Sequence, residues 1–392
     1  MRLSLQFAKI TVFVSITAMF LLIYQFKSDL VYYNFNLNGR LGSSENNLKY
    51  ILLWTYPKDE PLVSIGFKQS EFITRNCSYT NCFVTANRNY LFDYSKFHAI
   101  VFTIPQAKTY SLSEFPRHRS PDQKYVACST ESSHYYPICS NRLDNYFNWT
   151  WSYRLDSECR FGYIIVRDIH GNVIGPNKTM HWMKVEDMKN VSSELKNSLQ
   201  SKTIAAAWFA SNCFSKSKRE LFVQNLRNEL NKYNHSIVVY GVCGNKTLCP
   251  RRNNKRCLEI IKQTYYFYLA FENSFSEDYV TEKLLIALKN NAIPVVYGGA
   301  NYTRFMPDGM YLNARTLGPK QLALQMDSLI KNPDKYADYF RWKNHYSYHI
   351  NHESPETDNV CSFCKLLNDE KKFSEKSVVK NFRTWWDFPK FC

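Results

Sequence analysis

Short apolar runs alternate with amphipathic segments along most of this chain. The runs are rich in β-branched and aromatic residues and end in polar or Pro-containing loops, a pattern typical of buried parallel strands. The predicted strands are 50–56, 97–104, 124–130, 203–211, 236–244, 261–273 and 291–299. Helical patterns occupy 217–233 and 278–290, between strands of the second group. Strands that alternate with helices predict βαβ units and parallel sheets.

Two such regions follow one another, separated by a polar stretch at 189–202. The sequence therefore predicts an α/β fold with two Rossmann-like domains that face each other across a cleft, with ligands at the carboxyl ends of the strands. We place the first domain at 49–195 and the second at 196–350. Residues 351–392 are set apart as a C-terminal tail that contains a C-x-x-C motif.

The N-terminus carries a different signal. Residues Ile10–Tyr24 form an apolar run that follows Arg2 and Lys9. No small-residue cleavage site follows the run, which favours a signal-anchor over a cleaved signal peptide. The stretch 8–26 is long enough to span the hydrocarbon core, and the positive residues before it place 1–7 in the cytosol. Residues 27–48 are polar and predict a stem, so the rest of the chain is expected to be luminal.

Sequons and cysteines agree with a luminal location. Asn-x-Ser/Thr glycosylation candidates begin at Asn76, Asn148, Asn177, Asn190, Asn234, Asn245 and Asn301. The twelve cysteines include the close pair Cys361 and Cys364, which we interpret as disulfide candidates because an oxidising compartment favours such bonds. A zinc site is disfavoured because a second C-x-x-C is missing. The sequence leaves the pairing of the cysteines open.

The formal net charge of +16 favours anionic partners. A luminal domain does not meet nucleic acid, so the basic run at 251–256 is interpreted as a solvated loop and no nucleic-acid partner is expected. His345 and His349 have the spacing of metal ligands on a helix, but no third ligand is evident nearby, so the sequence predicts no metal site.

The segment Phe271–Lys283 is the strongest candidate for chemistry. A strand there runs through a polar loop into a helix expected to start near Asp278, and the amino end of a helix favours an anion. Tyr279, Glu282 and Lys283 would then lie at i, i+3 and i+4 on one face. Lys283 can neutralise a diphosphate, and Glu282 can accept hydrogen bonds from ribose hydroxyls. A solvated Glu-Lys pair on a helix surface is the competing interpretation.

Long motifs decide between these interpretations. The block "FENSFSEDYVTEKLLIALKNNAIPVVYGG" resembles the signature of the alpha-1,3/4-fucosyltransferases, glycosyltransferase family 10. The segments "NYFNWTWSYRLDSECRFGY", "WFASNCFSKSKRELFVQNL" and "CSFC" are similar to further blocks of that family. The resemblance covers everything from about Tyr50 to the C-terminus. It implies the GT-B arrangement of two facing Rossmann-like domains, with the acceptor bound by the first and GDP-fucose by the second.

The resemblance also implies roles for particular residues. Tyr279, Glu282 and Lys283 match residues that contact the donor, and Asn273 matches one that shapes their loop. Arg219 matches a basic helix residue that holds the diphosphate, although a surface helix Arg is a common alternative.

Glu131 matches the catalytic base of the family's E-S-P motif, which reads "ESS" here because Ser133 replaces the proline. A loop carboxylate without a catalytic role is the alternative for Glu131. Arg154 and Asp156 match a supporting pair, with a purely structural role as the other interpretation.

The implied reaction is an inverting transfer of L-fucose from GDP-β-L-fucose to the 3-hydroxyl of GlcNAc in glycoprotein N-glycans, by a type II Golgi membrane enzyme. A carboxylate would deprotonate the acceptor hydroxyl, and cations would stabilise the departing GDP without an obligatory cofactor, although divalent ions can stimulate such enzymes. The core GlcNAc is favoured as acceptor, and an antennal GlcNAc of Lewis type is the alternative. A membrane-anchored glycan-binding protein without activity is the alternative from another class.

Overall fold

The computed structural model describes residues 47–55, 61–244, 249, 254–387 and 391–392. The predicted anchor at 8–26, most of the predicted stem and the Asn245 sequon lie outside the described residues. Within the described part of the chain, no helix is long and apolar enough to cross a membrane. The chain divides into a unit that ends at Leu48 and a unit of residues Lys49–Cys392, and the second unit is described below.

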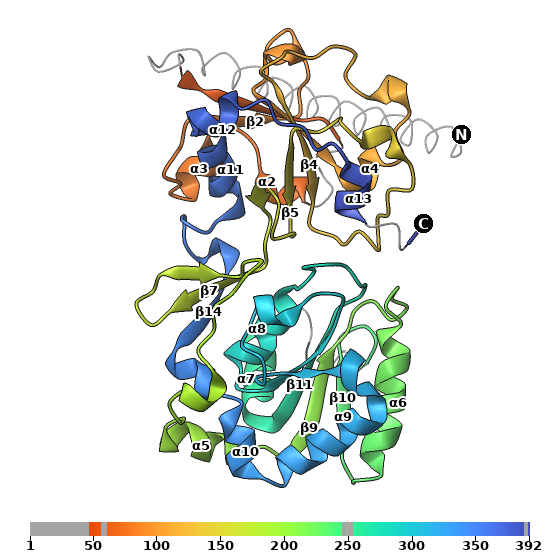
Figure 1. Ribbon diagram of the computed structural model, residues 1–392, viewed down its shortest axis with the longest axis vertical. Coiled ribbons are helices and arrows are strands. Elements are labelled where there is room, and N and C mark those ends of the chain that lie inside the picture. The colour runs from red at the N-terminus through yellow and green to blue at the C-terminus, as the bar shows by residue number, and fades with distance from the viewer. Residues whose placement is uncertain (1–46, 56–60, 245–248, 250–253, 388–390) are drawn as a thin grey trace, which may run out of the picture. The chain divides into compact units, whose positions relative to one another are not determined.

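The first lobe is built on a six-stranded sheet in which all neighbouring strands are parallel. The strands lie in the order β2-β1-β3-β4-β5-β6. Figure 1 labels β2, β4 and β5 of this sheet. Their bounds are β1 Lys49–Leu53, β2 Cys82–Thr85, β3 Ala99–Thr103, β4 Lys124–Ser129, β5 Trp149–Ser152 and β6 Cys159–Arg160. Every residue of β3 and β4 is buried, as expected for central strands covered on both faces. The strands predicted from three apolar runs are confirmed as β1, β3 and β4.

The second lobe contains a five-stranded parallel sheet in the order β10-β9-β11-β12-β13. Its strands are β9 Ile204–Phe209, β10 Ile237–Tyr240, β11 Tyr265–Phe271, β12 Ile293–Tyr297 and β13 Leu312–Asn313. Side chains of β11 alternate between two cores. Phe267 and Leu269 pack with residues of helices α6 and α9, whereas Tyr268 and Ala270 pack with residues of α7 and α8. Both faces of this sheet are therefore covered, and the predicted parallel strands of the second region are confirmed.

The helices are short except in the second lobe. Their bounds are α2 Leu62–Ile65, α3 Ser70–Thr74, α4 Ile104–Ala107, α5 Ser193–Gln200, α6 Arg219–Asn231, α7 Asn254–Thr264, α8 Glu282–Lys289, α9 Ala314–Ile330, α10 Pro333–Asp338, α11 Asn359–Asn368, α12 Glu370–Ser374 and α13 Phe382–Trp386. The predicted strand 261–273 begins only at Tyr265, because residues 261–264 complete α7. Ile261 continues the apolar pattern of the strand, but Lys262 and Gln263 are polar and belong to the last turn of α7. A short apolar run does not by itself distinguish a buried helix end from a strand.

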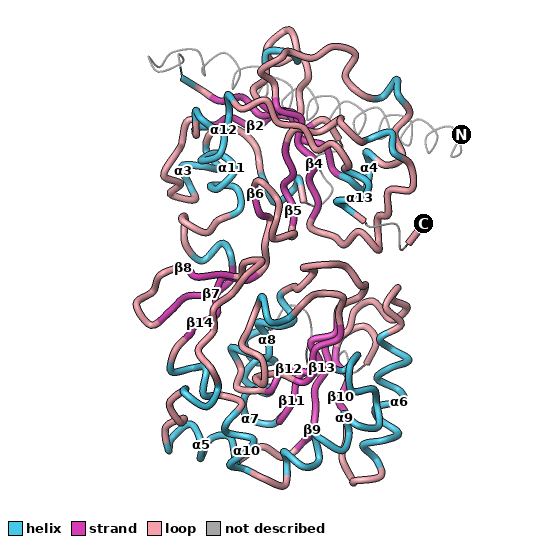
Figure 2. Tube along the Cα trace, in the orientation of Figure 1, coloured by secondary structure: helices cyan, strands magenta, loops and turns pink. Residues whose placement is uncertain are grey.

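A small antiparallel sheet and the C-terminal segment complete the unit. Strands β7 Ile164–Asp168, β8 Val173–Gly175 and β14 Tyr346–Ile350 pair in the order β14-β7-β8 (Figure 2). Beyond β14 the chain returns to the first lobe, where α11 packs against α3, β1 and β6. Disulfides join Cys361 to Cys77 and Cys364 to Cys82. The C-x-x-C segment is thus held by covalent bonds to the start of the first lobe.

Helix α8 begins later than the sequence predicts. The expected start near Asp278 is wrong, because the helix begins at Glu282 after an extended Thr281. Asp278 has a positive φ of 59°, in the left-handed region, and its carboxylate is held by Arg304 at 2.6 Å and by Lys178 at 2.8 Å. Tyr279 consequently lies in a loop and not on a helix face shared with Glu282 and Lys283. The loop conformation of Tyr279 therefore determines which residue its hydroxyl contacts.

The sequon at Asn148 is part of the first lobe's framework. Its Oδ1 accepts from the backbone N–H of Tyr125 at 2.7 Å, and its Nδ2 donates to the carbonyl of Ser377 at 2.7 Å. The sequon's Thr150 is buried and donates to Glu158 at 2.6 Å. The remaining candidates among the described residues, Asn76, Asn177, Asn190, Asn234 and Asn301, are exposed.

We therefore expect Asn148 to carry no glycan in the folded protein. A glycan attached at Nδ2 would displace the bond to Ser377 and separate the C-terminal segment from β4 and β5. Glycopeptide mass spectrometry of the luminal fragment tests this: the Asn148 peptide should be unmodified, whereas exposed Asn190 or Asn234 serves as the positive control. A fully occupied Asn148 would contradict the prediction.

Candidate active site

Glu131 lies in the loop that follows β4, which we call the β4 loop (residues 130–136). The side chain is half-buried, and its Oε2 accepts a hydrogen bond of 3.0 Å from the hydroxyl of Tyr279. Tyr279 belongs to the loop between β11 and α8, which we call the β11 loop (residues 272–281). Both loops start at the carboxyl ends of parallel strands, where ligand-binding groups of such sheets gather. The structure therefore brings together two of the predicted residues, one from each lobe.

The tyrosines around Glu131 remain protonated donors. Burial raises the pKa of Tyr279 well above its ordinary value, and the charges of Tyr163 and Glu131 raise it further. Burial likewise raises the pKa of Tyr163, and Glu131 adds to that effect. Tyr163 donates to the carbonyl of Thr130 at 2.8 Å and so fixes the start of the β4 loop. Glu131, Tyr163 and Glu282 line one cavity of about 990 Å³.

Glu272 is the residue that sequence reasoning missed. Its carboxylate is buried, accepts from the N–H and the hydroxyl of Thr281 at 2.9 Å each, and lies 3.1 Å from Nζ of Lys283. Burial raises the pKa of Glu272, and the Lys283 ammonium opposes that rise. Its position in "FENS" was the available signal, because a carboxylate that ends a fully buried strand needs partners.

Lys283 lies among three acceptors. Its Nζ donates to the Thr281 hydroxyl at 2.7 Å and lies 3.3 Å from Oε1 of Glu282, in addition to Glu272. Burial alone would lower the pKa of Lys283, but the two carboxylates reverse the effect and raise it. The Glu282 side chain is 54% exposed, so it is the partner that solvent reaches. The predicted Glu-Lys pair therefore exists, but a buried third residue anchors it.

At the amino end of α8, where the sequence predicts an anion, one backbone N–H already has an acceptor. Glu272 accepts the Thr281 N–H at the point where a phosphate was expected. The longer helix α6 presents a different amino end, which starts at Arg219 and follows the exposed Lys216 and Lys218. The cations and the helix dipole add there, and the charges of Glu272 and Glu220 act on Arg219.

Arg219 is 3% exposed, so it is not a solvated helix residue. It donates to the carbonyl of Phe271 and, at 3.3 Å, to that of Asn212. Burial lowers the pKa of Arg219, and the charge of Glu272 counteracts that shift. Asn273 accepts from the Ser274 hydroxyl at 2.9 Å, and its carbonyl accepts from the Ser217 N–H at 3.0 Å. Asn273 thus ties the β11 loop to the start of α6.

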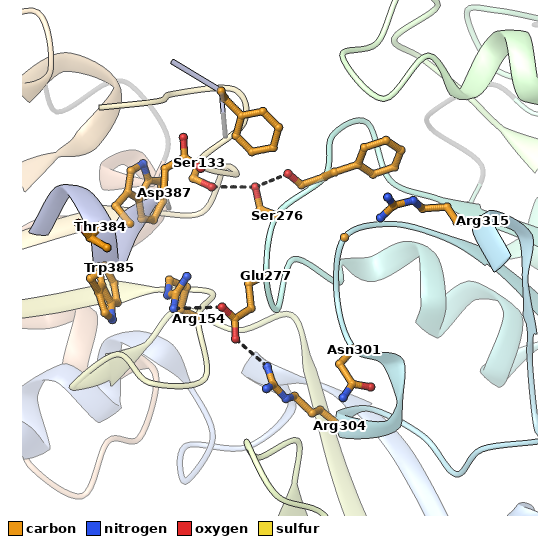
Figure 3. Close-up of a pocket in the computed structure, with 14 residues that line it drawn as sticks. Ser133, Arg154, Ser276, Glu277, Asn301, Arg304, Arg315, Thr384, Trp385 and Asp387 are labelled. Atoms are coloured by element: carbon orange, nitrogen blue, oxygen red, sulfur yellow. Dashed lines mark hydrogen bonds and ion pairs between the residues drawn. The ribbon is translucent and has the colours of Figure 1, made fainter. Parts of the chain in front are cut away.

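Arg154 lies elsewhere, at a second cavity of about 680 Å³ beside the β11 loop (Figure 3), and Asp156 is its partner. The guanidinium of Arg154 donates to both oxygens of Asp156 at 3.0 Å and lies 3.6 Å from Glu277. Glu277 also contacts Arg304 at 2.9 Å. These charges hold a loop of the first lobe against the β11 loop. Neither Arg154 nor Asp156 contacts Glu131, which favours a supporting role.

Among the residues that the structure describes, no group of three or more His, Cys, Asp or Glu side chains is arranged to hold a metal ion. His345 accepts from the Lys189 N–H at 3.1 Å, and His349 contacts Glu353 at 3.1 Å. The two histidines that share a helix-like spacing therefore have separate partners.

Comparisons with known proteins identify the family of the chain. Residues 199–385 match the family model described as glycosyltransferase family 10 (fucosyltransferase) C-term, and residues 46–164 match the model described as fucosyltransferase, N-terminal. The chain is 34% identical over 316 residues to alpha-(1,3)-fucosyltransferase C of Drosophila melanogaster, covering 79% of this chain and 70% of that protein. It is 27% identical over 332 residues to glycoprotein 3-alpha-L-fucosyltransferase A of the same organism, of which it spans only 57%.

The fold is similar to that of a solved alpha1,3-fucosyltransferase crystallised with GDP-fucose, with a TM-score of 0.51 and 16% identity. That likeness covers 84% of this chain and 94% of the other, so it includes both parallel sheets. Family models over both lobes, a relative at 34% identity and the shared α/β architecture lead to one assignment. The chain belongs to glycosyltransferase family 10, the fucosyltransferases.

Proposed function

We propose that this fucosyltransferase transfers L-fucose from GDP-β-L-fucose to the 3-hydroxyl of an N-acetylglucosamine, with inversion at the fucose C1. The observation that carries the proposal is the contact between Glu131 and Tyr279 at 3.0 Å. It holds a carboxylate of the first lobe against the β11 loop of the second lobe, which leads directly into α8 and Lys283. Acceptor activation and donor binding are therefore adjacent.

Inversion requires one displacement, in which the acceptor oxygen attacks C1 from the face opposite GDP. Glu131 accepts the proton of the attacking hydroxyl as the new C–O bond forms and the bond to the β-phosphate breaks. Tyr279 has a raised pKa and stays protonated, so its hydroxyl donates to Oε2 and leaves the other oxygen of Glu131 for the acceptor. The tyrosine therefore orients the Glu131 carboxylate.

The departing diphosphate requires positive charge. Arg219, with Lys216 and Lys218 at the amino end of α6, supplies fixed cations and a helix dipole. The Lys283 ammonium adds a further cation when a phosphate oxygen takes the place of Oε1 of Glu282. At 3.3 Å, this oxygen is the most distant of the three acceptors around Nζ. The exposed Glu282 is then free to accept hydrogen bonds from the ribose hydroxyls, and Asn273 keeps the β11 loop in place. Charge neutralisation by side chains makes a cofactor unnecessary, although a divalent ion can add to it.

For the acceptor we propose the core GlcNAc of glycoprotein N-glycans, and for the location the Golgi membrane, with the catalytic body luminal and anchored through residues 8–26. The similarity to glycoprotein 3-alpha-L-fucosyltransferase A of Drosophila melanogaster supports a glycoprotein acceptor. The sequons and disulfides support the luminal side.

A secreted fragment starting at Lys49 and supplied with GDP-fucose and a panel of N-glycans tests the proposal. We expect a mass increase of one deoxyhexose on core-GlcNAc acceptors, located by fragmentation and by resistance of the core to glycosidases. Fucose found only on antennal galactosyl-GlcNAc would contradict the proposed core acceptor but would agree with the proposed transfer reaction. If the fragment binds glycans but neither transfers fucose nor releases GDP, the proposed enzymatic activity is wrong and the chain is a glycan-binding protein.

A further inference from the structure

Ser133 is the position at which this chain departs from the family's E-S-P motif. A proline there would have no backbone N–H and no hydroxyl, and its ring would fix the loop by restricting φ. Ser133 uses both of the groups that a proline lacks. Its N–H donates to the hydroxyl of Tyr153 at 3.1 Å, and its Oγ lies 2.9 Å from Oγ of Ser276 in the other lobe.

The partner hydroxyl is fixed as well. Ser276 donates to the carbonyl of Phe275 at 2.8 Å and accepts from the N–H of His134 at 3.2 Å. Ser133 and Ser276 are 3% and 6% exposed, so water does not compete for these groups. Figure 3 shows the two hydroxyls pointing toward each other at the wall of the second cavity. This pair we call the serine bridge.

Further bonds join the same two loops on either side of the serine bridge. Ser132 and Ser274, both fully buried, share a bond of 2.6 Å between their hydroxyls. The N–H of Phe275 donates to Nδ1 of His134 at 3.2 Å. Glu131 precedes this set of contacts directly, so the position of its carboxylate relative to the second lobe depends on them.

We propose that Ser133 and Ser276 are positioning residues that hold the β4 loop in register with the β11 loop and thereby aim Glu131 at the acceptor hydroxyl. The proposal rests on the proposed function of Glu131 as the base. In this chain two directed hydrogen bonds replace the restriction that a proline ring gives the loop. Neither serine contacts Glu131, so both act through the loop backbone.

The test compares Ser133→Ala, Ser276→Ala and the double variant with the wild-type fragment. Losing one buried hydroxyl bond should lower kcat roughly fivefold, in line with the usual worth of such a bond. KM for GDP-fucose and Kd for GDP should not change, since neither serine lies at α6 or Lys283. The double variant should be no worse than Ser276→Ala alone, because Ser276→Ala already removes the bond to Ser133 and in addition deprives the His134 N–H of its acceptor.

The control variant is Ser113→Ala. The hydroxyls of Ser113 and Ser111 share a hydrogen bond of 2.9 Å inside one exposed loop. Ser113→Ala therefore removes a similar bond between two hydroxyls, but one that does not connect the two lobes. It should leave kcat at the wild-type value. An unchanged kcat in Ser133→Ala and Ser276→Ala, independent losses that multiply in the double variant, or a raised KM with constant kcat would each overturn the proposal.

Hydrogen exchange separates this proposal from the assigned reaction. Ser133→Ala should accelerate amide exchange in the peptide that covers residues 271–281 of the opposite lobe, and Ser113→Ala should not. If the wild-type fragment transfers no fucose at all, the proposed reaction is wrong. Faster exchange of the 271–281 peptide in Ser133→Ala would still support the serine bridge in that case, and unchanged exchange would overturn it.

Discussion

Replacing Glu131 with glutamine should reduce fucose transfer by about 10³-fold while leaving GDP affinity within twofold, since general bases contribute typically 10²–10⁴ in rate. The amide has the shape of the carboxylate and can still accept from Tyr279, but it does not take a proton from the acceptor. Steady-state transfer and a GDP titration of the same sample provide the two measurements. The fall should appear in kcat, because the proton moves only in the transition state.

Two variants control this experiment. Glu370→Gln makes the same chemical change on an exposed carboxylate at the start of α12 and should transfer fucose at the wild-type rate. Tyr279→Phe keeps the base but removes its 3.0 Å hydrogen bond, so we expect a smaller fall, roughly tenfold, as for one bond to a charged group. Wild-type transfer by Glu131→Gln would show that another group accepts the proton.

The strands were predictable because their short runs are rich in β-branched and aromatic residues and end in polar or Pro-containing loops. Strands such as Ala99–Thr103 and Lys124–Ser129 are buried along their whole length, as expected for strands covered on both faces. The start of α8 was not predictable from the pattern. It depends on the left-handed conformation of Asp278 and on the ion pairs that its carboxylate makes with Lys178 and Arg304, residues distant in the sequence.

The candidate site shows the same division. Family motifs and strand ends together predict that Glu131 and Tyr279 lie in one cleft. The structure shows a direct contact between them, which the sequence does not predict. Glu272 was overlooked because a carboxylate at a strand end is common in loops, and its importance comes from burial beside Lys283. Return of the C-terminal helix to the first lobe depends on disulfides between residues more than 280 positions apart, which spacing does not reveal.

Glu272→Ala should destabilise the protein by about 3–5 kcal/mol, the usual cost of removing one partner from a buried ion pair. The change leaves the Lys283 ammonium without the carboxylate 3.1 Å away and deprives the N–H and hydroxyl of Thr281 of their acceptor. Two lobes can unfold separately, so a single unfolding midpoint for the whole unit is not sufficient. The measurement is therefore a thermal scan in which the amide protection of a peptide from α8 reports on the second lobe. Glu370→Ala, at the exposed site, should leave the midpoint unchanged.

A second substitution distinguishes loss of the ion pair from loss of packing. Adding Lys283→Met to Glu272→Ala removes the unpaired buried charge and should recover part of the lost stability, since a buried pair can be exchanged for apolar side chains at much smaller cost. The same double variant should bind GDP more weakly than the wild type, because it lacks a cation that the diphosphate needs. Recovery of stability without recovery of GDP affinity would assign Glu272 to holding Lys283 and Lys283 to holding the donor. A Glu272→Ala variant as stable as the wild type would show that the Lys283 ammonium reaches water or Glu282 instead.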